Sequence, residues 1–273
     1  MSETVHTAAS ELQHPGRFLR EAAGDLRRSV APAWQLFRRN MQVRYRRAGL
    51  GYLWLLLPTV GTTLVWVYVQ SRRIIDVAPT DVPYPVYVLT GTILWQVFVD
   101  ALNAPLQQLT ASRQLITRSR VPHEALILAA TFEVLLNCAV RLVILVPVLF
   151  FFRASVGPAA LLVPVGVAAL LLFGLALGLF AAPLGMLYDD VGRGITLVTG
   201  FLFFLTPVIY RTPSAGILRF NPLTPLLDTT RAWLTGGEGR GGFAAVTAVT
   251  LLALVLAWLF ERLARPHMVA RLG

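Results

Sequence analysis

Long apolar stretches are the feature of this chain that most restricts its fold. A helix needs about 20 consecutive, mainly apolar residues to cross the hydrocarbon core of a bilayer. Six stretches approach or exceed this length, at about 50–69, 86–102, 126–152, 159–187, 195–210 and 243–260. Only 14% of the residues are charged, compared with about 25% in an average soluble domain. The sequence therefore predicts an all-α, polytopic membrane protein with six transmembrane helices.

The segment between the last two stretches is apolar but interrupted. Residues 217–233 contain Pro222 and Pro225, which prevent one long helix. We expect short re-entrant helices that dip into the outer leaflet before the last span, which requires cover from protein or a water-filled cavity. The preceding stretch, 195–210, is itself short for a complete crossing.

The distribution of arginines indicates how the chain is oriented. All 24 basic residues are arginine, and the formal net charge is +10. Cytoplasmic loops of membrane proteins carry an excess of basic residues. With the N-terminus inside, the cytoplasmic segments hold sixteen arginines and the outer loops seven, while Arg141 lies within a span. We therefore expect both termini to be cytoplasmic, and this topology explains the basicity without a nucleic-acid partner.

The missing lysine limits the chemistry of the chain. A P-loop needs the lysine of its G-x-x-x-x-G-K-[ST] motif to contact the nucleotide phosphates. If ATP drives transport here, the ATPase is therefore another polypeptide. The polar first 30 residues lack the apolar core of a secretory signal peptide, so we expect the first span to act as the insertion signal. Cys138 is the only cysteine, which excludes a disulfide within one chain.

An arginine-rich amphipathic segment, about 34–48, follows a polar tail at 1–33 and leads directly into the first span. Its apolar side chains recur at helical spacing, and most arginines fall on other faces. The segment includes Trp34, Phe37, Arg38, Met41, Arg44, Tyr45 and Arg46. Such a helix suits the plane of a membrane surface, with its arginines among lipid phosphates. A solvated basic tail is the alternative.

The loop between the second and third spans combines apolar and basic residues. Leu115 and Ile116 are apolar residues set among arginines, and Pro122 ends the segment before the next helix. The basic residues of the loop are Arg113, Arg118, Arg120 and, when protonated, His123. An apolar centre with a charged rim is typical of a helix that docks into a groove of a partner. An ordinary positive-inside loop is the alternative.

The third span carries three polar residues on one face. Glu133, Asn137 and Arg141 are spaced i, i+4 and i+8. Because ionisable groups within a span are costly, they usually face a bundle interior or a water-filled path. Glu133 and Arg141 are about 12 Å apart along the axis, so Asn137 or a residue of another helix must mediate between them. A polar wall of a transport path, a network between subunits, an internal brace, and snorkelling of Arg141 all remain open.

Two further patterns concern packing and substrate contact. Gly174, Gly178 and Ala182 allow close helix approach in lipid, either within one subunit or between two. Aromatic residues near the membrane edges are typical interfacial anchors, but those facing a channel could stack on sugar rings. The aromatic channel candidates are Tyr68, Trp95, Phe98 and Tyr210.

Catalytic chemistry has little support in the sequence. The four histidines lack a partner at metal-ligand spacing such as that of H-E-x-x-H. Asp189 and Asp190 could hold Mg²⁺ and a phosphate, but a solvated loop or a helix start is the simpler interpretation. We therefore expect no catalytic residue and no metal site.

Five motifs in the same order resemble those of ABC-2 type permeases that export polysaccharides, including O-antigen, capsule and teichoic acid. The motifs are RYRRAGLG at 44–51 with Trp54 and Pro58, LITRSRVP at 115–122, YDDVGR at 188–193, TPVIY at 206–210, and NPLTP at 221–225 continuing to Arg231. The resemblance covers about residues 34–262. Arginine replaces the family's usual lysines, and His123 stands where arginine is common.

The resemblance implies a transport subunit, not an enzyme, in a bacterial cytoplasmic membrane. It implies a homodimer with two copies of a separate ABC ATPase subunit, which holds ATP and Mg, so that no cofactor is expected on this chain. The loop at about 112–124 would be the coupling helix seated in the ATPase, the helix at 34–48 a gate helix, 49–262 the transmembrane domain and 263–273 a cytoplasmic tail. The substrate would be a lipid-linked polysaccharide. A drug or small-lipid exporter, or a glycosyl- or phospho-transferase built on Asp189 and Asp190, are the alternatives.

Overall fold

All regular structure in the described part of the chain is helical, which confirms the all-α prediction. The computed structural model describes residues 23–46, 51, 53–74, 80, 82–112, 122–154, 156–211, 220–237, 239 and 241–272, and it describes side chains for all of these except 44–46 and 266–272. The helices are α2 (Val30–Arg46), α3 (Leu53–Ser71), α4 (Tyr84–Ala111), α6 (His123–Phe151), α7 (Val163–Leu187), α8 (Asp190–Phe204), α9 (Leu223–Leu234) and α10 (Phe243–Leu272), with a 3-10 turn, η2 (Pro158–Leu162), before α7.

Five of the helical segments are long and apolar enough to cross a membrane. They are Leu53–Ser71, Tyr84–Ala111, His123–Phe151, Pro158–Leu187 and Phe243–Arg265. The remaining predicted span forms α8, which has only 15 residues and a length of about 22 Å, less than the hydrocarbon core of about 30 Å. Five crossings are thus supported by length and composition, and the sixth stays a prediction.

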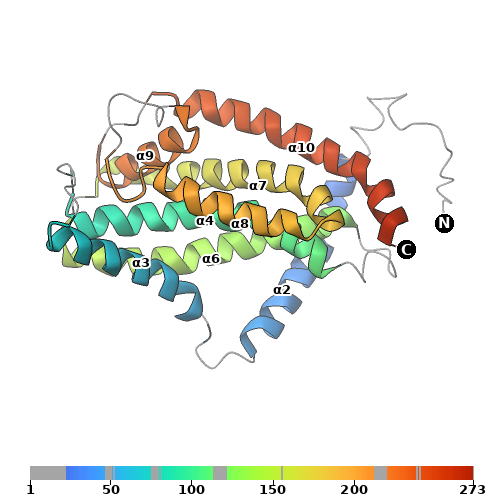
Figure 1. Ribbon diagram of the computed structural model, residues 1–273, viewed down its shortest axis with the longest axis horizontal. Helices are drawn as coiled ribbons and strands as arrows, with labels where there is room; N and C mark the ends of the chain where they lie inside the picture. The colour runs from blue at the N-terminus through green and yellow to red at the C-terminus, as the bar shows by residue number, and fades with distance from the viewer. Residues whose placement is uncertain are drawn as a thin grey trace.

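Helix α4 is the centre of the bundle (Figure 1). It packs against α3, α6 and α7, while α7 also packs against α10, and α2 crosses the first turns of α6 at one end. In the most apolar 18-residue stretch of α4, 78% of the residues are buried, compared with 11% in the corresponding stretches of α3 and α10. Helices α3 and α10 therefore present most of their apolar surface outward, as lipid-facing helices do.

The small residues predicted to mediate close packing do so within this subunit. A side chain at Gly174 would place its Cβ 2.6 Å from the carbonyl oxygen of Phe98 on α4. A Cβ at Gly178 would overlap the carbonyl oxygen of Leu102, one turn further along, and Ala182 is completely buried. The glycines let the backbones of α7 and α4 touch, as small residues do in membrane bundles, so the first of the two predicted arrangements is correct.

Candidate functional site

The predicted gate segment forms a helix that begins at Val30, before the expected start at Trp34. Its aromatic face packs on α6: the rings of Trp34 and Phe37 lie 5.8 and 6.1 Å from that of Phe132, centroid to centroid. Arg38 is exposed and Met41 half-buried, whereas the side chains of Arg44, Tyr45 and Arg46 lie outside the description. The helix is thus held to α6 by aromatic contacts, and its placement on a membrane surface stays a prediction.

The predicted coupling helix lies mostly outside the described residues, which omit Arg113, Leu115, Ile116, Arg118 and Arg120. Ser112 and residues 122–124 of the predicted range are described. Pro122 has extended backbone angles, φ −59° and ψ 131°, and α6 begins immediately after it at His123.

 Pro83 precedes α4 in the same way, with φ −50° and ψ 132°. Helix α6 therefore begins directly after the segment predicted to be the coupling helix.

A cluster of charged side chains joins the start of α6 to the end of α10. Glu124 and Glu261 are 3% and 0% exposed. Arg265 lies between them, 2.7 Å from an oxygen of each, and His123 Nδ1 is 3.6 Å from Glu261 Oε1. Arg262 adds contacts of 3.4 Å to Glu124 and 2.8 Å to Asp25, just before α2. Because buried carboxylates are stable only when paired and hydrogen-bonded, this charge cluster holds α6, α10 and the segment before α2 together at one end of the bundle.

The polar face of the third span finds its partner on α4. Arg141 Nη1 donates to Asp100 Oδ2 at 2.6 Å, and the two side chains are 5% and 21% exposed. Another helix therefore supplies a partner for Arg141, and mediation between Arg141 and Glu133 stays a prediction. Its burial against Asp100 excludes snorkelling to the membrane surface. Asp100 was not among the predicted site residues, because a single carboxylate in a span gives no indication of which helix it faces.

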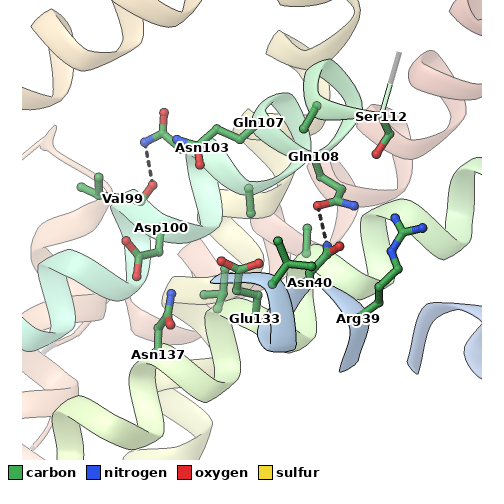
Figure 2. A pocket seen from close by; sticks show the side chains of 15 residues that line it. Arg39, Asn40, Val99, Asp100, Asn103, Gln107, Gln108, Ser112, Glu133 and Asn137 are labelled. Carbon is green, nitrogen blue, oxygen red and sulfur yellow. Dashed lines mark hydrogen bonds between the residues drawn. The ribbon is translucent and has the colours of Figure 1, made fainter. Parts of the chain in front are cut away.

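Glu133 and Asn137 line an open pocket between α2, α4 and α6, whose lining combines polar side chains with valines and alanines. The pocket has a volume of about 710 Å³. Asp100, Glu133 and Asn137 point toward one another at one end of it (Figure 2), and Asn40 Nδ2 of α2 donates to Gln108 Oε1 of α4 at 3.3 Å at the other end. A cavity lined by carboxylates and amides within a helical bundle is suited to binding water or a polar ligand.

Two of the predicted aromatic channel residues belong to the core of the subunit. Trp95 and Phe98 are 4% and 1% exposed. The Trp95 ring lies 5.7 Å from that of Phe203, and Phe98 stacks on Phe173 at 5.8 Å. Neither ring offers a free face to a sugar, so this burial argues against their predicted role. The physical reason is that α4 is the central helix, and its aromatics fill the space between neighbouring helices.

The other two aromatic candidates lie nearer the surface. Tyr68 is 57% exposed, and the guanidinium carbon of Arg72 lies 5.3 Å from its ring centroid. Tyr210 is half-buried, and its hydroxyl donates to the Phe204 carbonyl at 2.7 Å. Their contact with a substrate stays a prediction.

Four successive backbone carbonyls after α8 each accept a hydrogen bond from a side chain. Arg231 Nη2 on α9 donates to the carbonyls of Pro207 and Val208, both at 3.0 Å. The hydroxyls of Tyr84 and Tyr87 on α4 donate to the carbonyls of Ile209 and Tyr210 at 3.1 and 2.9 Å. Non-helical backbone at membrane depth must have its polar groups satisfied by protein. This set of donors therefore permits the chain to leave the helix after Phe204 without reaching water.

The Arg231 side chain itself is completely surrounded by protein. It is 4% exposed, and its guanidinium carbon lies 3.8 Å from the centroid of the Tyr87 ring, with Asp228 Oδ1 at 3.4 Å from Nη1. A side chain at Gly91 would overlap both this guanidinium and the Val208 carbonyl. Helix α9 corresponds to the predicted re-entrant region, but whether it lies within the membrane stays a prediction.

The two acidic residues considered for phosphate chemistry lie at the start of α8. Asp189 occupies the N-cap position and Asp190 the first turn. Asp190 Oδ1 lies 3.1 Å from Arg193 Nη1, and both side chains are more than 80% exposed. Acidic groups at this position stabilise a helix N-terminus. Within the described ranges, no group of three or more histidine, cysteine or acidic residues could hold a metal ion.

These features define an integral membrane protein with a polar pocket inside its helical bundle. Comparison with known families gives its class: the model of the ABC-2 type transporter family matches residues 32–234, and the chain belongs to this family. The resemblance indicated by the sequence motifs is thereby confirmed.

Several curated proteins are similar to the chain over most of its length. The O-antigen export system permease protein RfbA of Myxococcus xanthus is 25% identical over 234 residues, 80% of this chain and 87% of the relative. RfbA of Klebsiella pneumoniae is 20% identical over 234 residues, with 82% and 89% covered. The polysialic acid transport protein KpsM of Escherichia coli is 22% identical over 231 residues, with 79% and 88% covered.

Proposed function

We propose that this chain is the membrane subunit of an ATP-driven exporter that moves a lipid-linked polysaccharide across a bacterial cytoplasmic membrane. The observation that carries the proposal is its similarity to O-antigen and polysialic acid transport proteins over about four-fifths of its length. The polar pocket and the paired charges within the helical bundle support it, because such groups in spans usually mark a transport path.

The proposed assembly has two copies of this subunit and two of a separate ABC ATPase, with ATP and Mg bound only by the ATPase. Both termini, the gate helix α2 and the coupling helix at about 112–124 lie on the cytoplasmic side. ATP-driven closure of the ATPase dimer displaces the coupling helix, which leads into α6 at His123. Because α2 packs on α6 and the charge cluster ties α10 to the same end, the three helices move together as a rigid body.

The proposal is tested by exchanging both Leu115 and Ile116 for aspartate in the full complex. Two buried charges in the ATPase groove would prevent docking, so we expect loss of ATPase co-purification and of surface polysaccharide. Gln114→Asp adds one charge to the same segment without removing the apolar centre, and it serves as the matched control. Retention of the ATPase by the double variant would contradict the coupling role, and export without any ATPase would contradict the proposal as a whole.

Deleting the gene distinguishes the substrate classes. We expect intracellular accumulation of lipid-linked polysaccharide and none at the cell surface. Sensitivity to small toxic compounds with normal surface polysaccharide would instead indicate the drug-exporter alternative. The exposed Asp190–Arg193 pair at the start of α8 gives no support to a transferase. The variant carrying both Asp189→Asn and Asp190→Asn should therefore match the wild type in any assay of glycosyl or phosphate transfer.

A further inference from the structure

The pocket between α2, α4 and α6 has a lining suited to one chemical class of ligand. We infer that it binds a short, uncharged stretch of the transported glycan through its hydroxyl groups. This inference rests on the proposed function and names a binding site for part of the substrate within a single subunit. The pocket volume of about 710 Å³ lies within the range of about 300–1,000 Å³ that is typical of ligand sites.

Side-chain amides dominate the polar lining. They come from all three helices and are Asn40, Asn103, Gln107, Gln108 and Asn137. An amide both donates and accepts hydrogen bonds, as a sugar hydroxyl does. On α4, Asp100, Asn103 and Gln107 recur at helical spacing, so the polar groups form a column along one face of the helix. A packed apolar interface would not require this column.

The charges around the pocket balance, which favours a neutral ligand. The charged lining residues are Arg39, Asp100 and Glu133. Arg141, which does not itself line the pocket, forms an ion pair with Asp100 at 2.6 Å. Two arginines therefore accompany the two carboxylates. A site for a free cation or for a phosphate would show an excess of one sign. Carboxylates beside amides instead match the hydroxyl groups of an uncharged sugar.

One lining residue carries a polar atom without a partner. Asn137 is only 8% exposed, and its Oδ1 has no hydrogen-bond partner among the described residues. Buried polar atoms are normally satisfied, so each exception calls for a specific explanation. Figure 2 shows this amide at the end of the pocket beside Asp100 and Glu133. A small rotation of the amide would let it bind a ligand hydroxyl that enters the pocket.

Helix α2 forms one wall of the pocket through Arg39, Asn40 and Val43. The hydrogen bond from Asn40 to Gln108 at 3.3 Å is a contact of α2 with α4 across the pocket. Displacement of α2 would break this bond and widen the space between the two helices. The pocket would then receive glycan when α2 moves away and retain it when α2 returns.

The first experiment measures protection of a single cysteine in cells that make the native glycan. Cys138→Ala removes the native thiol, Gln107→Cys places one in the pocket, and N-ethylmaleimide labels it. We expect labelling at least threefold slower when glycan assembly is on than when it is blocked. Thr110→Cys on the same helix, outside the pocket lining, should label equally in both states. Adding Asn137→Leu to the Gln107→Cys protein should remove the protection. Equal labelling of Gln107→Cys in both states, or protection that persists with Asn137→Leu, overturns the inference.

The second experiment measures export. Replacing Asn103 with leucine keeps the approximate volume but removes its hydrogen bonds to a sugar, so the initial rate of polysaccharide appearance at the cell surface should fall about fivefold. Gln96→Leu makes a comparable change on α4 outside the pocket and should leave the rate unchanged. If both variants export at the wild-type rate while gene deletion abolishes export, the pocket assignment fails and the proposed function stands. If deletion leaves surface polysaccharide normal, the proposed function fails, and the inference fails with it.

Discussion

Replacing Arg141 with methionine removes the positive partner of Asp100 from the middle of the bundle. The two groups are in direct contact at 2.6 Å and are 5% and 21% exposed. Two unit charges with centres about 4 Å apart attract each other by about 4 kcal/mol at the effective dielectric constant near a protein surface. Breaking a buried pair by removing one member costs about 3–5 kcal/mol. Because Asp100 reaches the pocket and is partly solvated, we expect the free energy of unfolding to fall by about 3 kcal/mol.

The double variant with Asp100→Asn tests the physical cause. It leaves no unpaired charge, so its stability should recover to within about 1 kcal/mol of the wild type. The wild type, the two single variants and the double variant form a double-mutant cycle. The stability of each is measured by unfolding in mixed micelles with increasing denaturing detergent, followed by far-ultraviolet circular dichroism. Arg193→Met breaks the exposed Asp190 pair and should change stability by less than about 0.5 kcal/mol. If the two single substitutions simply add in the double variant, the ion pair is not the source of the stability.

Three further predictions concern the other contacts. Gly178→Val forces a side chain into the Leu102 carbonyl and should destabilise the protein by about 3 kcal/mol in thermal unfolding, whereas Gly200→Val, which meets nothing within 4 Å, should not. Glu261→Gln weakens the contact with Arg265 and should accelerate hydrogen exchange at the end of α10, measured by mass spectrometry. Arg231→Met leaves two carbonyls without their donor and should lower the free energy of unfolding by about 2–4 kcal/mol in the same detergent titration.

Each of these predictions has a contrary outcome. A stable Gly178→Val protein would mean that α7 and α4 are not in backbone contact. Unchanged hydrogen exchange in Glu261→Gln would show that the charge cluster does not hold α10. An Arg231→Met protein as stable as the wild type would show that another group or water satisfies the freed carbonyls. Arg231→Lys provides an intermediate test, since lysine keeps the charge but lacks the planar fork of arginine.

Local patterns predicted the helices well, because helix formation in a bilayer depends on length and hydropathy. The arginine-flanked helix before the first span and the spans around α4, α6, α7 and α10 could be predicted in this way. The end of α8 could not, because it depends on distant donors. Residues 195–210 read as one apolar stretch, yet the helix ends at Phe204, and the carbonyls that follow are satisfied from α4 and α9.

The sequence alone could not predict which residues of distant helices form pairs. The spacing of Glu133, Asn137 and Arg141 predicted a shared face correctly, but not that Asp100 opposes it. Arg265 likewise contacts Glu124, 141 positions away, and no local pattern indicates such a contact. Trp95 was predicted to line a channel because an aromatic ring facing one could stack on sugar rings, whereas the central position of α4 buries it.

The dense centre of the bundle restricts where a long polymer can travel. Phe98, Leu170 and Leu226 are among the side chains that exclude solvent almost completely from the space around α4. A continuous conduit cannot pass through such packing without unfolding it. Under the proposed function, an extended glycan would therefore follow the perimeter of the subunit, where the second copy of the proposed assembly would complete the walls of its path.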